Sequence, residues 1–254
     1  MNRITLNHGG GASSRLKAFT LAEVLITLAI IGVVAALTIP SVVANYEKTQ
    51  IETKLKKAFN VISNSSLMAI KDYGPITTWN LGEVDVQKSA QNFVDTYMIP
   101  YLKVAKNCKG STSDDCSYGV FYLNGDKPSD EYNLTNENAA RFILADGSII
   151  SVQVFGVYAS VMVDINGHKK PNVFGKDVFL MRYQLVHNGV STGNIRFPGS
   201  KDNSTSVKSS GNYHYCNKNA DGKGCGRLIL QNGWKIPTKE QFVDWGGDPK
   251  NYPW

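Results

Sequence analysis

The chain has 254 residues, of which 42% are hydrophobic and 19% charged, and its formal net charge is +6. This length and composition fit one good-sized globular domain with an appendage. Three basic residues, Arg3, Arg15 and Lys17, lie in the first 18 residues, which contain no acidic residue; beyond them, 24 scattered basic residues face 21 acidic ones. No basic stretch interleaved with aromatic residues remains, so we expect no nucleic-acid partner.

The first predicted element is an apolar helix near the N-terminus. From Val24 to Tyr46 the sequence has 23 residues without a charge. A helix of that length, rising about 1.5 Å per residue, would extend about 35 Å and could span a bilayer. The apolar run begins at Phe19, and Glu23 is its one charged residue. A carboxylate in hydrocarbon costs about 2.5–3.5 kcal/mol on insertion scales, so Glu23 needs a functional explanation and a partner.

Two general interpretations leave Glu23 unexplained. The segment could be an uncleaved signal anchor, or a secretory signal peptide that is cut after Ala44, where Val42 and Ala44 loosely fit the small-residue rule. The apolar region is longer than the roughly 7–15 residues that a signal peptide uses.

The residues around Glu23 point to a third interpretation. Lys17-Ala18-Phe19-Thr20-Leu21-Ala22-Glu23 resembles the leader junction of type IV pilins and type II secretion pseudopilins. The resemblance implies a leader at residues 1–18, cleavage by prepilin peptidase between Ala18 and Phe19, and N-methylation of Phe19. The family usually has glycine where this chain has Ala18. Gly32 and Pro40 lie where the family's helix usually has its glycine and its kinking proline.

The resemblance also implies a partner for Glu23. Cleavage would create an α-amino group on Phe19, one turn away, which could pair with its own Glu23 or with that of a neighbouring subunit. The family implies the second arrangement, which fixes the register of a filament. The alternative is that Glu23 only reaches for the membrane interface near the helix start. Implied partners are prepilin peptidase, other pilin or pseudopilin subunits, and the bacterial inner membrane before assembly, with the head outside the cytoplasm.

The helix is predicted to continue beyond the assembly segment at 19–46. Residues 47–74 carry one apolar stripe at helical spacing, with Lys and Glu opposite, formed by Ile51, Leu55, Phe59, Ile62 and Ala69. Gly74-Pro75 should end the helix, and Pro40 should bend it or melt it locally.

Residues 75–254 are predicted to form a globular head. A second helix is expected within residues 86–103, ending before Pro100, and Asp146-Gly147 is a strong hairpin signal between two strands. The expected strands are Tyr118–Leu123, Arg141–Ala145, Ser148–Phe155, Ala159–Ile165 and Val178–His187. The fold class is therefore α+β, with a long N-terminal helix, transmembrane and then amphipathic, packed on an antiparallel sheet, as in pilins.

The four cysteines fall in two local pairs, and each pair closes a short polar loop. We expect disulfides between Cys108 and Cys116 and between Cys216 and Cys225, although four cysteines allow three connectivities. Disulfides imply an oxidising compartment. Four free thiols are the alternative; the spacings do not fit a zinc site.

One loop of the predicted head is a candidate calcium-binding site. Asp164, Asn166 and Asp177 place oxygen donors on a glycine-rich segment whose Asp-x-Asn-Gly resembles the opening of a calcium loop. However, Lys169 and Lys170 lie within the segment, and the residues that would supply the other ligands of a calcium loop are missing. A turn in which the Asp and Asn side chains cap backbone amides is therefore favoured. No other cofactor is indicated.

No set of catalytic residues emerges, because the four histidines are isolated and the common catalytic motifs are missing. The resemblance at the leader junction implies a structural subunit of a type IV pilus or type II secretion pseudopilus, assembled through its N-terminal helix. The alternatives are a membrane-anchored or secreted binding protein and, less favoured, a tethered enzyme.

Overall fold

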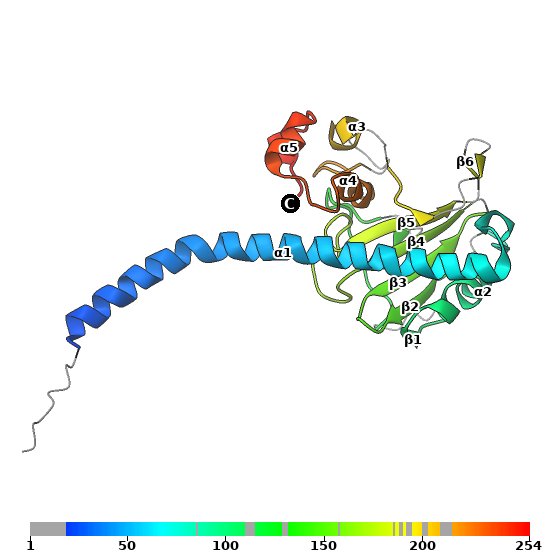
Figure 1. Ribbon diagram of the computed structural model, residues 1–254, viewed down its shortest axis with the longest axis horizontal. Helices are drawn as coiled ribbons and strands as arrows, with labels where there is room; N and C mark the ends of the chain where they lie inside the picture. The colour runs from blue at the N-terminus through cyan, green and yellow to red at the C-terminus, as the bar shows by residue number, and fades with distance from the viewer. Residues whose placement is uncertain are drawn as a thin grey trace, which may run out of the picture. The chain divides into compact units, whose positions relative to one another are not determined.

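The computed structural model describes residues 19–84, 86–109, 115–128, 132–156, 158–184, 186–187, 190–191, 195–199, 203–208 and 215–254 (Figure 1). The chain divides into two compact units, Met1–Tyr46 and Glu47–Trp254, and the second is called the head unit below. The predicted leader at 1–18, including Ala18, lies outside the described residues.

Helix α1 extends from Leu21 to Tyr73 and is not interrupted at Pro40, so of the two effects predicted for this proline, a bend or local melting, the melting does not occur. The helix ends as the sequence predicts. Gly74 has a φ of +79°, a left-handed conformation that glycine adopts without strain, and its N–H donates to the carbonyl oxygen of Ile70 at 2.9 Å.

The head unit contains an antiparallel sheet of six strands in the order β1-β2-β3-β4-β5-β8. The hairpin predicted at Asp146-Gly147 joins β2 to β3, with Gly147 at a φ of +85° and Phe142 opposite Ile150. A small second sheet pairs β6 with β7. The strands are β1 (Val104–Asn107), β2 (Ala140–Leu144), β3 (Ile149–Val154), β4 (Tyr158–Asp164), β5 (Val178–Gln184), β6 (Val186–His187), β7 (Val190–Ser191) and β8 (Ile195–Arg196).

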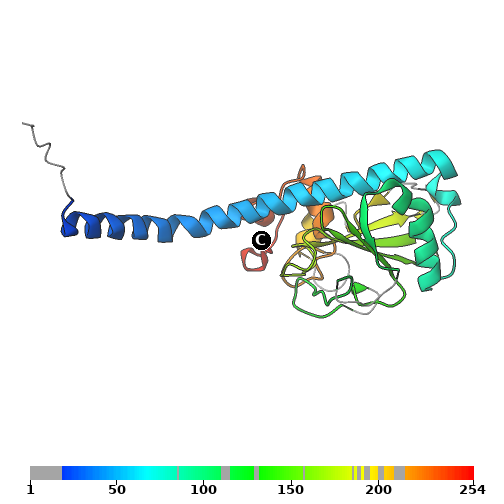
Figure 2. The same ribbon diagram turned by 90° about the horizontal axis from the view of Figure 1, so that it is seen from below.

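The head part of α1 lies along one face of this sheet, and the short helix α2 (Gln87–Tyr97) packs beside it (Figure 2). Leu55, Ile62 and Ala69 of the predicted apolar stripe are fully buried. They join one core with α2 and with alternate residues of the strands, among them Phe142, Val161 and Met181. The α+β fold class, with a long helix packed on an antiparallel sheet, is confirmed.

The opposite face of the sheet is also covered, which explains an incorrect strand prediction. Tyr118–Leu123 is not a strand: only Phe121 forms a bridge, to Val173. This segment crosses the sheet as a loop, and Val120 and Tyr122 pack into a second core against sheet residues such as Met162 and Leu180. The alternation of apolar residues in the sequence therefore reflects burial of one side of a loop and not strand pairing.

The C-terminal region adds three short helices, α3 (Asn203–Lys208), α4 (Cys225–Gln231) and α5 (Lys239–Asp244), which the sequence analysis did not predict. Glu52 of α1 ties this region to the helix, because its carboxylate accepts from Lys235 Nζ at 2.7 Å and from the N–H of Ile236 at 2.9 Å. Trp254 donates from Nε1 to the carbonyl oxygen of Gly175 at 3.0 Å. The C-terminal aromatic residues therefore pack onto the head.

Candidate assembly site and head surface

The candidate assembly site is built on the first turn of α1, where Thr20 and Glu23 cap each other. Glu23 Oε2 accepts from the backbone N–H and from the hydroxyl of Thr20, both at 2.9 Å. In return, the N–H of Glu23 donates to Thr20 Oγ1 at 3.2 Å. This reciprocal pattern is a capping box, in which two backbone donors at the helix start gain side-chain acceptors.

The capping box gives Glu23 a local partner that the sequence analysis missed, although its signature, Thr-x-x-Glu before an apolar run, stands in the sequence as Thr20-Leu21-Ala22-Glu23. Both hydrogen bonds end on Oε2. Within the described residues no donor reaches Oε1, so one carboxylate oxygen is open to a further cation. Phe19, whose α-amino group cleavage would free, precedes the capping threonine and is 85% exposed.

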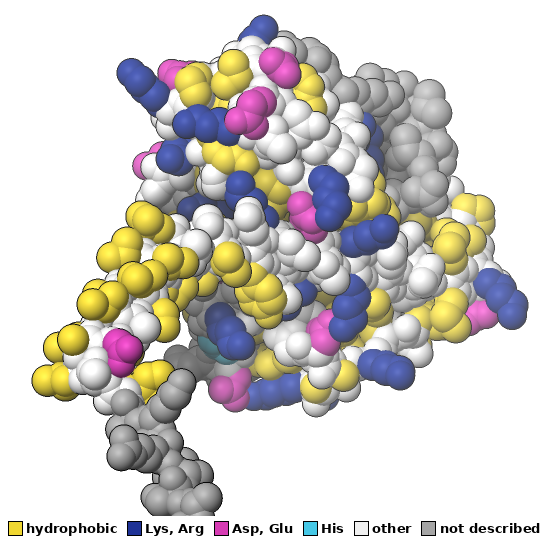
Figure 3. All heavy atoms as spheres, turned by 60° about the vertical axis from the view of Figure 1, so that its left-hand side comes forward, with side chains coloured by type: hydrophobic (Ala, Val, Ile, Leu, Met, Phe, Trp, Pro, Cys, Tyr) yellow, Lys and Arg dark blue, Asp and Glu magenta, His cyan; other side chains and the backbone are white. Residues whose placement is uncertain are grey.

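The remainder of the segment is apolar and exposed. Figure 3 shows yellow side chains along this helix, and the large apolar residues from Phe19 to Val43 are exposed. Gly32 has no neighbouring atom within 4 Å of the position that a Cβ would take, so no packing in the isolated chain requires a glycine there. By length and composition the helix could cross a membrane.

The cysteine loops of the head unit contain the two expected bonds. Cys108 is joined to Cys116, and Cys216 to Cys225. The second bond is fully buried in a small core with Leu228, Phe242 and Tyr252. It therefore ties the first residue of α4 to the segment at Cys216 that precedes this helix.

Asp164 and Asp177 of the calcium candidate are both buried. Asp164 accepts from Tyr118 Oη at 2.8 Å and from the N–H of Asn166 at 3.0 Å. Both carboxylate oxygens of Asp177 accept backbone hydrogen bonds, from the N–H groups of Asn172 and Val173 at 2.8 and 2.7 Å. Burial raises the pKa of Asp164 to about 7, against the opposing effect of its hydrogen bonds, and burial also raises the pKa of Asp177.

These hydrogen bonds favour the alternative in which the carboxylates cap backbone amides. Asn166 Nδ2 also donates to Asp177 Oδ2 at 3.2 Å, so Asn166 is joined to Asp164 through its backbone N–H and to Asp177 through its side chain. Among the described residues, no three His, Cys, Asp or Glu side chains are grouped so that they could hold a metal ion. The calcium site stays a prediction that the structure does not favour.

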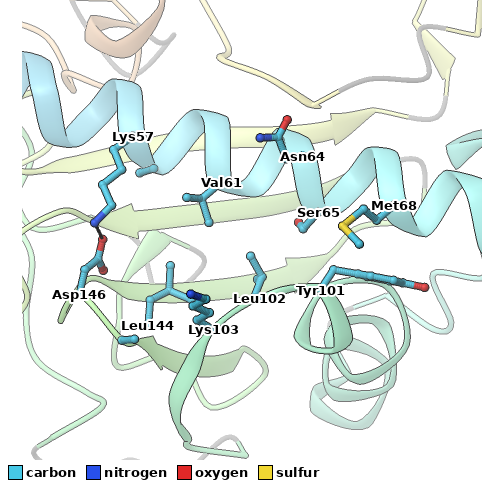
Figure 4. A pocket seen from close by; sticks show the side chains of 12 residues that line it. Lys57, Val61, Asn64, Ser65, Met68, Tyr101, Leu102, Lys103, Leu144 and Asp146 are labelled. Carbon is cyan, nitrogen blue, oxygen red and sulfur yellow. Dashed lines mark ion pairs between the residues drawn. The ribbon is translucent and has the colours of Figure 1, made fainter.

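Among the grooves that border the helix in the described part of the head unit, two differ clearly in their lining. The first has a volume of about 330 Å³ and is mainly apolar, with Val61 and Met68 on α1 facing Leu102 and Leu144 (Figure 4). At one end Lys57 Nζ and Asp146 Oδ2 form an ion pair at 2.8 Å, drawn as the dashed line. Partial burial opposes ionisation of Asp146, but this pair and hydrogen bonds from Ser148 together lower its pKa.

The second groove, called the lysine groove below, has a volume of about 320 Å³. It lies between residues 47–54 of α1, where the head unit begins, and the loop that leads from β4 to β5. Its walls carry Lys54, Lys170 and Lys176, and its apolar lining is formed by Ile51, Ile165 and Pro171. The same groove is lined by Glu47, Gln50, Asn166 and Asp177.

Comparisons with known families agree with the geometry of the first turn. Residues 14–39 match the family described as "Prokaryotic N-terminal methylation motif". Residues 41–127 match a second family, described as "Family of unknown function (DUF6613)". Comparison with curated proteins and with solved structures found no match.

The matched motif contains Phe19, Thr20, Glu23 and Gly32, and helix α1 begins within the motif and extends beyond it. An apolar N-terminal helix that begins within such a motif is consistent with anchoring of the chain in the inner membrane, followed by assembly into a filament. The motif also indicates processing by prepilin peptidase. The chain thus carries the N-terminal methylation motif that is typical of the type IV pilin and pseudopilin family.

Proposed function

We propose that this chain is a structural subunit of a type IV pilus or a type II secretion pseudopilus. Prepilin peptidase would cut between Ala18 and Phe19 and methylate the new amino group of Phe19. The processed subunits would then pack through residues 19–46, whose apolar side chains are exposed in the single chain. Burial of this surface between helices would supply the packing contacts of the filament.

The observation that carries the proposal is the position of Glu23. It is the only charged residue between Phe19 and Tyr46, and it lies one helical turn from the residue that cleavage would make the N-terminus. Thr20 holds its carboxylate through Oε2 and leaves Oε1 open. An ammonium group from a neighbouring subunit could then pair with this oxygen, which would satisfy two charges that are costly in hydrocarbon.

Substitutions in the capping box separate the charge of Glu23 from its role as a cap. Glu23→Gln removes the charge but keeps a side chain that can complete a capping box, whereas Thr20→Ala removes the cap and keeps the charge. Filament incorporation should be measured for both variants in cells, beside the amount of each variant in the membrane. We expect Glu23→Gln to lose incorporation at normal membrane levels, and Thr20→Ala to retain it.

Two results would contradict the proposal. Normal incorporation of Glu23→Gln would show that the charge is not used in assembly. Equal loss in Thr20→Ala and Glu23→Gln would show that Glu23 acts only as a helix cap. An anchored binding protein or a tethered enzyme, in contrast, would reach the surface regardless of either change. The methylation motif is typical of structural filament proteins and not of enzymes.

A further inference from the structure

We propose that the lysine groove binds the headgroup of an anionic phospholipid, such as phosphatidylglycerol, while the subunit is anchored in the membrane. This inference rests on the membrane anchoring of the proposed function and concerns a different part of the chain. The groove is in the head unit, on the first turns that follow the apolar segment.

The lysine groove is rich in positive charge. Lys54, Lys170 and Lys176 line the groove, and none of them has an ion-pair partner among the described residues. Of the two acidic residues in the lining, Asp177 already accepts hydrogen bonds on both oxygens, which leaves Glu47 as the one exposed acid. Three cations brought together from two separate segments, with one exposed acid, form a site that suits a phosphate group.

The groove also has an apolar lining, which suits a phospholipid better than a free phosphate ion. Ile51, Ile165 and Pro171 line the same groove as the three lysines. Lys54 and Lys176 are half-buried, as expected when the methylene stem of a lysine lies on an apolar surface and its ammonium group reaches outward. A lipid could place its phosphate on the lysines and its glycerol and first methylenes on the apolar lining. The volume of about 320 Å³ is sufficient for a small ligand.

The α1 residues that line the groove directly follow the apolar segment in the chain. Glu47 follows Tyr46, the last residue of the uncharged segment, and Lys54 lies two helical turns after Glu47. Lys54 is eight residues after Tyr46, so it is close in the sequence to the segment that would enter the membrane. Basic residues next to a membrane-spanning helix attract anionic lipids, each contributing about fivefold in affinity.

The test uses the full chain in micelles of an uncharged detergent to which phosphatidylglycerol or phosphatidylcholine is added. Native mass spectrometry counts the bound lipid. We expect one phosphatidylglycerol per chain at low lipid fraction and no comparable binding of phosphatidylcholine. The double substitution Lys170→Gln and Lys176→Gln should raise the phosphatidylglycerol fraction needed for half-occupancy about 25-fold, at about fivefold for each lysine.

The matched control is Lys88→Gln with Lys127→Gln, which changes the net charge equally at two exposed lysines outside the groove. This control should bind phosphatidylglycerol as the unmodified chain does; an equal loss would mean that only total charge matters and would overturn the proposal. Retained binding in the groove variant would overturn it, as would displacement of the lipid by the same concentration of inorganic phosphate. Filament incorporation is measured separately, so a failed lipid test leaves the proposed function intact.

Discussion

Ser66 and Tyr183 are joined by a hydrogen bond between their hydroxyl groups, 2.8 Å long and buried between α1 and β5. Ser66 Oγ donates its own hydrogen to the carbonyl oxygen of Ile62 at 2.7 Å, so Tyr183 is the donor in the pair. The Tyr183 ring also lies against Trp79 and Phe93, with ring centroids 5.9 and 5.7 Å away. One polar contact thus orients the long helix on an otherwise apolar sheet face.

Tyr183→Phe should lower the free energy of unfolding of the head unit by about 1 kcal/mol, because it removes one buried hydrogen bond and keeps the ring. Denaturant unfolding of the full chain in detergent, followed by tryptophan fluorescence, would measure this change. Tyr73→Phe is the matched control, since Tyr73 is 49% exposed and its hydroxyl makes no hydrogen bond with the described residues. An equal change in both variants would refute a specific role for the Ser66–Tyr183 contact.

The buried Asp164 should make the head unit less stable as the pH rises from about 4 to 7. Its pKa is raised by burial to about 7 in the folded chain, whereas an unfolded aspartate has a pKa of about 3.9. Between these values the unfolded chain releases a proton that the folded chain keeps, so the free energy of unfolding falls with pH, by on the order of 2–4 kcal/mol. Asp164→Asn should reduce this loss, as shown by unfolding curves at several pH values, and Asp177, whose pKa burial also raises, should account for the part that remains.

Asp146 provides a control of opposite sign for the same measurement. The pKa of Asp146 is lowered in the folded chain, so its contribution to stability is present above about pH 4 and is lost as the pH falls through the folded value. Asp146→Asn should therefore flatten the acid side of the stability curve and leave the loss toward pH 7 in place. If Asp164→Asn kept the pH dependence of the unmodified chain, its raised pKa would be refuted.

Much of the fold could be predicted because local signals and burial agree. The apolar stripe of residues 47–74 faces the sheet, Gly74 ends the helix, and Gly147 turns the β2–β3 hairpin. The strands β3 and β4 are rich in apolar residues and almost entirely buried, and the sequence predicts both. Each of these features is specified by residues that are close together in the chain.

The missed elements depend on distant partners. β1 is a four-residue edge strand with exposed lysine and alanine, and β8 has two residues, so neither has a clear pattern. α4 follows Gly224 and is held by a disulfide at its first residue, Cys225. At the candidate site, the charge of Glu23 marks this residue in the sequence, whereas its capping contact with Thr20 emerges from the structure, although the Thr-x-x-Glu spacing is present in the sequence.

The two disulfides should differ in their contribution to stability. They close loops of similar length, with sequence separations of 8 and 9, so the entropic stabilisation lost on removing either is similar, about 2–3 kcal/mol. The Cys216–Cys225 bond also packs with Phe242 and Tyr252 in a small core. Replacing both cysteines by alanine should therefore destabilise the head unit more at 216 and 225 than at 108 and 116, as measured by denaturant unfolding. The opposite order would contradict the packing argument.

Calcium should not stabilise the head unit, because the carboxylates of Asp164 and Asp177 are already used by hydrogen-bond donors. A ligand at 100 times its dissociation constant would add about 2.7 kcal/mol to the free energy of unfolding. Thermal unfolding with millimolar calcium and with a chelator should give the same midpoint. A higher midpoint with calcium that disappears in Asp177→Asn would instead support the calcium loop.

The N-terminal residue of the mature chain decides between the interpretations of the apolar segment. Mass spectrometry of the terminal peptide from membranes should find N-methyl-Phe19, because the methylation motif covers the junction and Thr20 caps a helix that begins directly after it. A mature chain beginning at Asn45 would mean that the segment is discarded as a signal peptide, and Met1 would mean a permanent anchor. The variant Ala18→Gly introduces the residue that is usual in the family at this position. It should give the same N-terminal residue, with equal or faster processing. A terminus unaffected by loss of prepilin peptidase would contradict the filament proposal, since the amine that Glu23 is proposed to meet would then have another origin.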